Sequence, residues 1–277
     1  MKQLFRHRFG DTLQVVNRAV EQRDDALQVP ERHAALVMEY GHYVKRCHER
    51  ISISRSDAVN RVINLIGWYE REGTLLTSVG DVLQSLHPMI ARDFCFLERV
   101  KIDTGTKPIS SSDFSEPGKI TLNAELINTH VDFIEHLYHE TIHQKLFVLY
   151  YLSIKSGGFY EFPEASEIEF KGSWHSESGL SIDRAVAAAH VYSHLFVLSV
   201  NSEKSDNSVS KRGTVQIKRF FELSNFLIEH NRAFSDQGRE FVSWLTEQDG
   251  RIPMDLPQNI AHESTLKKAG AFLDYIL

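Results

Sequence analysis

Residues 133–152 read FIEHLYHETIHQKLFVLYYL, and this stretch decides both the expected fold and the expected chemistry. It is strongly apolar and lacks glycine and proline, so it predicts one long buried helix over Thr129–Ile154. It contains the HExxH pattern, from His139 to His143. Residues four apart on a helix share a face about 6 Å apart, and two imidazoles so placed can bind one metal ion at about 2.1 Å each. Glu140 can then face a metal-bound water or a substrate.

The segments around this helix predict a mainly α protein of α+β type. Phe94–Ile102 and Lys119–Asn123 are typical of strands, and the turn formers between them, Thr104–Gly118, predict a loop. Apolar residues at helical spacing predict further helices over Asp11–Val29, Glu31–Glu49, the residues after Ser56-Asp57, Ser78–Leu86, Ile182–Val200, Thr214–His230, Asp236–Gln248 and His262–Tyr275. We expect a helical domain with a small β-sheet beside a zincin-like HExxH helix. An N-terminal helical region, residues 1–92, and a metal-site region with the C-terminal helices, residues 93–277, would form one compact domain.

Composition excludes several classes of protein. The chain has 277 residues and a net charge of -6, from 31 Lys and Arg against 37 Asp and Glu, which argues against binding to nucleic acid or to a membrane surface. Its two cysteines, Cys47 and Cys95, make no disulfide framework and suit a reducing compartment. The N-terminus lacks the apolar core of a secretory signal, and no apolar run reaches the roughly 20 residues of a membrane helix. We therefore expect a cytoplasmic protein.

Histidines are concentrated around the HExxH helix. Seven of the 14 lie between residues 130 and 194, which favours a metal or acid–base site. His190 is the preferred third ligand, because the alanines at 185 and 187–189 keep its helix slim enough to pack closely on the first. His194 is the substitute. Four glutamates follow His143 by 18 to 26 residues, Glu161, Glu164, Glu167 and Glu169, and Glu164 or Glu167 could take the place of the third ligand of zinc proteases. Pairing His136 with His139 is less favoured, since it leaves Glu140 without a role.

With these residues placed, the chain resembles the HExxH-motif peptide-modification proteins, which are associated with iron- and 2-oxoglutarate-dependent β-hydroxylation. Three blocks carry the resemblance: a serine-rich stretch with a PGxIxL strand, an LxHExxHxKL helix, and a tryptophan followed by an arginine and a histidine. Here they are Ile109–Ser112 with Pro117–Leu122, Leu137–Leu146, and Trp174 with Arg184 and His190. Two positions depart from the third block: Ala185 replaces a proline, and His175 replaces an arginine.

The resemblance implies a non-haem iron dioxygenase that hydroxylates a C–H bond, the β-carbon by analogy, of an amino-acid residue in a ribosomal natural-product peptide, or of a free amino acid. Its cofactor and co-substrate would be Fe(II) and 2-oxoglutarate, with His139, His143 and His190 as metal ligands. Arg184 would bind the far carboxylate of 2-oxoglutarate, because arginine suits bidentate carboxylate binding. The pocket would be lined by Ser111, Ser112 and Trp174. A separate leader-peptide recognition protein is an expected partner.

Two other functions stay open at this point. One is a zinc metallopeptidase of the HExxH type, in which Glu140 acts as general base on a zinc-bound water. The other is a non-catalytic helical binding protein with a structural or vestigial metal site. The serine and PGxIxL blocks favour the hydroxylase over the peptidase, and the intact Glu140 weighs against the third hypothesis.

Overall fold

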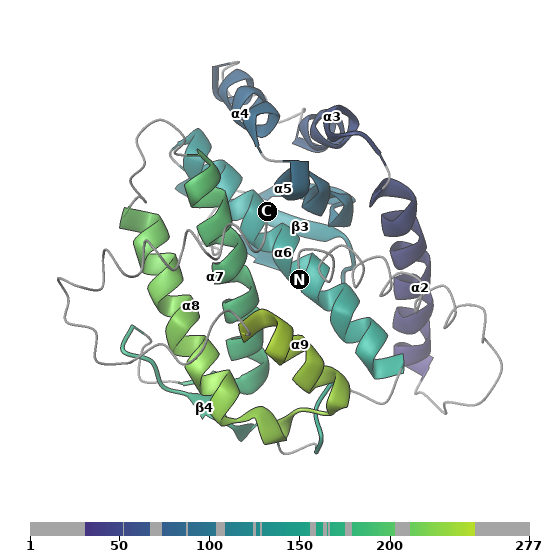
Figure 1. The fold of residues 1–277 in the computed structure, drawn as a ribbon. Coiled ribbons are helices and arrows are strands. Elements are labelled where there is room, and N and C mark those ends of the chain that lie inside the picture. Colours follow the sequence, from purple (N-terminus) through teal and green to yellow (C-terminus); the bar gives the residue numbers. More distant parts are fainter. Residues whose placement is uncertain are drawn as a thin grey trace. The chain divides into compact units, whose positions relative to one another are not determined.

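Most of the described chain is helical, with a small sheet in its N-terminal half, so the mainly α prediction is confirmed (Figure 1). The computed structural model describes residues 31–51, 53–66, 74–86, 88–103, 109–123, 126–127, 129–155, 159–162, 165, 167–174, 179–202 and 211–246. The predicted helices Asp11–Val29 and His262–Tyr275 lie outside these residues. The described residues form two compact units, an N-terminal unit that ends at Tyr151 and a C-terminal unit that begins at Leu152. Residue 92, the predicted boundary, lies inside a helix of the N-terminal unit.

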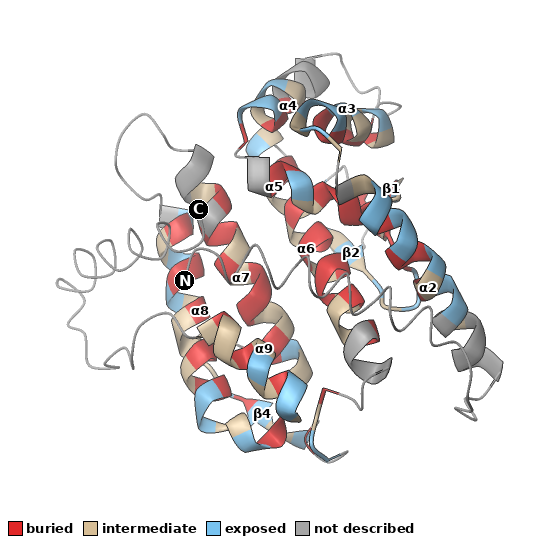
Figure 2. Ribbon diagram, turned by 45° about the vertical axis from the view of Figure 1, so that its right-hand side comes forward, coloured by how far each residue is buried: buried red, intermediate tan, exposed pale blue. Residues whose placement is uncertain are grey.

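In the N-terminal unit, helices and a 3₁₀ turn precede the sheet: α2 (Glu31–Ile51), α3 (Arg55–Ile66), α4 (Thr74–Ser85), α5 (Pro88–Asp93) and η1 (Phe94–Phe96). One side of α2 is buried and the other is exposed (Figure 2). On the buried side, the Tyr40 ring stacks on Phe114 and on Tyr151, with centroids 4.7 and 5.1 Å apart. The hydroxyl of Tyr43 donates to the carbonyl of Phe96 at 2.5 Å. Aromatic packing thus joins α2 to the rest of this unit.

The sheet of the N-terminal unit has the strand order β1-β3-β2. β3 (Lys119–Asn123) is parallel to β1 (Arg99–Asp103) and antiparallel to β2 (Ser110–Ser112), with Ser110 opposite Leu122 and Ser112 opposite Ile120. Ile120 and Leu122 are buried, as the period-two alternation of a half-buried strand requires. β2 is therefore an edge strand whose position is set by its pairing with β3.

The HExxH segment lies on α6 (His130–Lys155), which agrees within a residue at each end with the predicted helix. Its start is capped by Thr129, whose hydroxyl accepts from the Asp132 N–H at 3.1 Å and donates to the Asp132 carboxylate at 2.7 Å. The long apolar run without a helix breaker and this cap together explain why the helix forms here.

Two sequence-based predictions about the strands were wrong. The predicted strand from Phe94 begins as the 3₁₀ turn η1, because three consecutive buried residues, Phe94–Phe96, cannot alternate between two faces of a strand. Residues 104–118 were predicted to be a loop, but β2 lies within them. Its three serines have little strand propensity, so pairing with β3 and contacts to α6 fix this strand.

The C-terminal unit contains a two-stranded sheet, β4 (Glu169–Phe170) with β5 (Leu180–Ser181), and the helices α7 (Ile182–Ser202), α8 (Lys211–Glu229) and α9 (Asp236–Thr246), with η4 (Asn231–Ala233) before α9. α7 and α8 pack along each other over much of their lengths (Figure 1). Ala185 and Ala189 of α7 are small and buried; the predicted close packing of this helix against the HExxH helix stays a prediction. None of the described helices is both long and apolar enough to cross a membrane.

Candidate functional site

The two histidines of the HExxH pattern point to a common position beside α6. His139 Nε2 lies 3.1 Å from His143 Nε2, and the ring centroids are 4.9 Å apart. Two nitrogens that each bind one metal at about 2.1 Å lie roughly 3.0 to 3.4 Å apart, so the separation fits a shared ion as well as a hydrogen bond between neutral rings. The His139 side chain is 33% exposed, which leaves this position open to an incoming ion.

Electrostatics keep both imidazoles neutral at pH 7. Burial lowers the pKa of His139, and the neighbouring Glu140 carboxylate opposes only part of this effect. Burial also lowers the pKa of His143, and the adjacent His139 lowers it further. A neutral imidazole is the form that binds a metal, so the pair needs no deprotonation at neutral pH.

Glu140 is buried and held by two hydroxyls of β2. Ser110 Oγ donates to Oε1 at 2.7 Å, and Ser112 Oγ donates to Oε2 at 2.5 Å. Ser110 Oγ also lies 3.3 Å from His136 Nδ1, and Glu140 Oε1 lies 3.9 Å from His139 Nε2. The carboxylate is therefore fixed next to the histidine pair, and both of its oxygens already accept a hydrogen bond.

The serine contacts follow the alternation of a strand. Ser110 and Ser112 stand on the same face of β2, whereas Ser111 lies between them and is exposed. Of the two serines predicted to line the pocket, Ser112 thus contacts Glu140, and Ser111 does not. Ser110 was missed by the sequence analysis, and its signal was the i, i+2 spacing with Ser112 in a segment interpreted as a loop.

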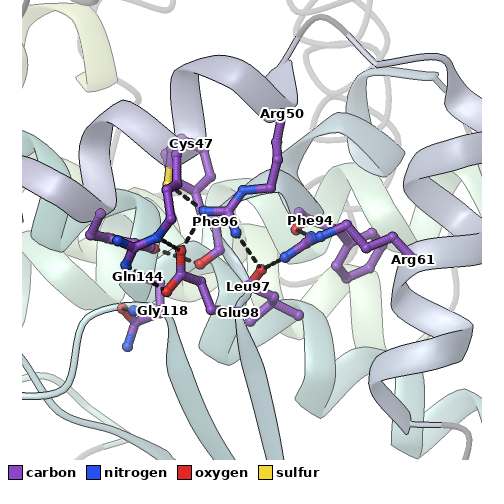
Figure 3. A network of polar contacts seen from close by, with 11 residues as sticks. Cys47, Arg50, Arg61, Phe94, Phe96, Leu97, Glu98, Gly118 and Gln144 are labelled. Carbon is purple, nitrogen blue, oxygen red and sulfur yellow. Dashed lines mark hydrogen bonds and ion pairs between the residues drawn. The ribbon is translucent and has the colours of Figure 1, made fainter.

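Gln144, the residue after His143, anchors the turn that joins β2 to β3 (Figure 3). Its side chain is fully buried; Oε1 accepts from the Gly118 N–H at 2.7 Å, and Nε2 donates to the Lys119 carbonyl at 3.0 Å. Gly118 has φ 76°, and a Cβ there would lie 2.6 Å from Cγ of Glu98, so only glycine fits. The helix that carries the histidines therefore also positions the hairpin that carries the serines.

The same turn is tied to α2 and α3 by charged groups (Figure 3). The Gly118 carbonyl accepts from the backbone N–H of Glu98 at 2.7 Å, and the Glu98 carboxylate forms an ion pair with Arg50 at 2.9 Å. Arg50 and Arg61 both donate to the carbonyl of Leu97. These arginines satisfy carbonyls at the end of η1 that the sheet leaves unpaired.

A buried ion pair fixes α6 on either side of the HExxH segment. Lys145 Nζ donates to Asp93 Oδ1 at 2.8 Å, and the Tyr138 hydroxyl donates to Asp93 Oδ2 at 2.7 Å. Only 9% of the Lys145 side chain and 13% of the Asp93 side chain are exposed, so each charge depends on its partner. Lys145 is the lysine of the LxHExxHxKL block, whereas the sequence pattern singled out neither Asp93 nor Tyr138.

The predicted third ligand lies in the C-terminal unit. His190 is on α7 and fully buried, with its ring centroid 4.4 Å from that of His194, 5.8 Å from Phe241 and 6.3 Å from Trp244. Among the described residues, no three His, Cys, Asp or Glu side chains come together as a metal site. The assignment of His190 to the same ion as His139 and His143 stays a prediction.

Of the other candidate metal ligands, all but Glu164 are among the described residues. His194 is half-buried, and its Nδ1 lies 2.8 Å from the carbonyl of His190. Glu161, Glu167 and Glu169 are exposed, and Glu161 lies 3.9 Å from Arg239, whereas Glu164 lies outside the described residues.

The two remaining predicted pocket residues also belong to the C-terminal unit. Arg184 is exposed in the first turn of α7, and its binding of 2-oxoglutarate stays a prediction. Trp174 is half-buried against the rings of Phe170 and Tyr192, with centroids 5.9 and 5.8 Å away. The guanidinium of Arg219 lies over its ring at 4.8 Å. The cation beside Trp174 is therefore Arg219, which the sequence analysis did not single out.

Comparison of the sequence with models of known protein families and with curated proteins found no match.

Proposed function

We propose that the protein is an Fe(II)- and 2-oxoglutarate-dependent dioxygenase that hydroxylates a C–H bond of an amino-acid residue, in a peptide or as a free amino acid. The net reaction converts one C–H, one O₂ and one 2-oxoglutarate into one C–OH, one succinate and one CO₂. His139 and His143 hold the metal, and His190 is the predicted third ligand. Bound iron would supply the activation of O₂ with the keto acid, which protein side chains alone do not provide.

The environment of Glu140 is the observation that carries this proposal. A peptidase needs the carboxylate of this residue to take a proton from a metal-bound water. Here both oxygens already accept serine hydroxyls, at 2.7 and 2.5 Å, which fixes the carboxylate against β2. This favours a role in which Glu140 is held still and orients groups near the metal.

The other residues support the same assignment. The neutral histidine pair is ready to bind a divalent ion, and Ser110 and Ser112 of the small sheet contact the same helix. The Glu140 carboxylate also lies 3.9 Å from His139 Nε2, which keeps a zinc peptidase as the alternative. A carboxylate oxygen can accept more than one hydrogen bond, so in that alternative Glu140 would take the proton while both serines stay in place.

Turnover of 2-oxoglutarate separates the two functions. The purified protein loaded with Fe(II) should form succinate in air, and the zinc-loaded protein should not. Glu140→Gln should keep iron binding and measurable succinate formation, while hydroxylation of an added peptide becomes uncoupled from it. Hydrolysis of peptides by the zinc-loaded wild type, stopped by Glu140→Gln, would show that the peptidase assignment is right and the hydroxylase assignment wrong.

A further inference from the structure

An arginine of the C-terminal unit lies against two aromatic rings outside the HExxH helix. Arg219, on α8, lies with its guanidinium carbon 4.8 Å from the ring centre of Trp174 and 5.4 Å from that of Tyr192 on α7. Its Nη1 donates to the Tyr192 hydroxyl at 3.0 Å. The two rings lie 5.8 Å apart at 87° to each other, so they flank the guanidinium on adjacent sides and leave its remaining edge for a ligand.

Most of the donors on this edge are unused. A guanidinium has five N–H groups, and the described acceptors take one of them. Nε is buried without an acceptor in the described part of the chain, whereas Nη2 is not buried and no described group accepts from it. No carboxylate of the described residues lies within ion-pair distance, 4.0 Å, of Arg219. The Tyr192 hydroxyl accepts from Arg219, so its own proton is left to donate to the same place.

These observations point to a missing anion. A cation that is half-buried loses hydration, and the loss is offset when an anion accepts its remaining donors. The accessible Nη2 and the Tyr192 hydroxyl can each donate to an oxygen of a carboxylate. We propose that Arg219, Trp174 and Tyr192 form a binding site for a small organic carboxylate, with Arg219 as the charged contact and Tyr192 as a second donor.

The carboxylate of Glu222 should weaken the binding of an anion at this site. It lies three residues after Arg219 on α8, where side chains share a face, and it accepts from the Ser173 hydroxyl at 3.2 and 3.4 Å rather than pairing with Arg219. Its negative charge opposes the approach of another anion. Neutralising Glu222 should therefore strengthen carboxylate binding, the opposite of the effect of removing Arg219.

The site goes beyond the proposed function, because it does not depend on iron. Two sources could supply the carboxylate: a free keto diacid such as 2-oxoglutarate, or an acidic side chain of a substrate peptide. Both present the same group to Arg219, and the experiment separates them.

The test uses the full-length protein after removal of metal with a chelator, labelled with ¹⁵N-arginine. The Arg219 Nε–H signal is identified by its loss in Arg219→Gln. It is then followed during titration with 2-oxoglutarate and, separately, with an aspartate blocked at both termini, at constant ionic strength. We expect a saturable shift with at least one of the two, and the one that binds more tightly identifies the source. Sodium chloride at the same ionic strength should give no saturable shift.

Substitutions test whether Arg219 is the residue that binds the carboxylate. Binding measured by calorimetry should weaken about tenfold or more in Arg219→Gln, since a charge-assisted hydrogen bond is lost. It should weaken less in Arg219→Lys, which keeps the charge, and strengthen several-fold in Glu222→Gln. Lys218→Gln removes an exposed charge from the neighbouring position and should leave binding unchanged.

The proposal is overturned if neither carboxylate gives a saturable shift, or if Arg219→Gln binds as the wild type does. If Arg219→Gln fails to fold, the other two variants test the proposal. Carboxylate binding should then be weaker in Arg219→Lys and stronger in Glu222→Gln than in the wild type. Equal affinities in these two variants would contradict the site. Because no metal is present, these results are independent of the experiments that test iron-dependent turnover of 2-oxoglutarate.

Discussion

α6 and α7 were both predicted to supply metal ligands, yet the polar residues directly beside these histidines are held in different ways. On α6, Glu140 bonds to β2, Gln144 bonds to the β2–β3 turn, and Lys145 bonds to Asp93, all groups distant in the sequence. On α7, the Ser193 hydroxyl donates to the carbonyl of His190 within its own helix, and the contacts to α8 come from Tyr192 and Ser199. The ring of His190 itself lies among other rings.

This difference shows which of the two helices has its position fixed by hydrogen bonds to distant segments. Buried polar contacts between distant segments are directional, so they set the position of α6 against the sheet to within the tolerance of a hydrogen bond. Aromatic packing around α7 supplies burial with less directional restraint. We therefore expect substitutions on α6 to change a specific site, and those around His190 to act through packing unless His190 binds the metal.

The largest effect is expected from Lys145→Met, which removes one partner of the buried ion pair with Asp93. Leaving the other charge buried should lower the free energy of unfolding by about 3–5 kcal/mol. The matched control is Lys101→Met, which breaks an ion pair of 3.6 Å with a lysine 60% exposed and should cost less than about 1 kcal/mol. Urea unfolding measures both, and equal losses would contradict the contrast.

Removal of a histidine of the HExxH pair should be next in size. His139→Ala or His143→Ala should weaken Co(II) binding by about two orders of magnitude or more, since even partners of a ligand change metal affinity by about 10–100-fold. His42→Ala, exposed on α2, is the control and should bind as the wild type does. His190→Ala sharpens the comparison of the two helices: a loss of similar size makes His190 the third ligand, and an unchanged affinity excludes it.

A smaller effect is expected from the serines of β2. Ser112→Ala leaves one oxygen of the buried Glu140 carboxylate without its donor, which should cost about 1.5–3 kcal/mol of stability. Ser111→Ala, on the exposed face of the same strand, should change stability by less than about 0.5 kcal/mol. Thermal unfolding of the two variants compares them directly, and a reversed order would refute the arrangement around Glu140.

The smallest effect concerns pH. In the metal-free protein, burial lowers the pKa values of His139 and His143 below the ordinary value of about 6.5, so the unfolded chain binds more protons than the folded one just below that pH. Stability should therefore fall as the pH is lowered below about 6.5. The double variant His139→Asn, His143→Asn should show a flatter dependence, and an unchanged slope would contradict the lowered values.

The sequence predicted α6 well because its signals are local: a long apolar run, no helix breaker and a capping threonine. It failed for β2, whose serines form a strand through pairing with β3 and through Glu140. Arg219 was missed for the same reason, since its partner Trp174 lies 45 positions earlier in the chain. Contacts of this kind depend on the folded arrangement and leave no short-range periodic pattern.

The central claim, that iron and 2-oxoglutarate bind together at the HExxH helix, is tested most directly by an anaerobic absorption titration. Addition of 2-oxoglutarate to the Fe(II)-loaded protein should produce a visible charge-transfer band that is absent with Zn(II) and lost in His139→Ala and His143→Ala. A protein that binds Fe(II) through these histidines yet gives no band with 2-oxoglutarate would contradict the claim.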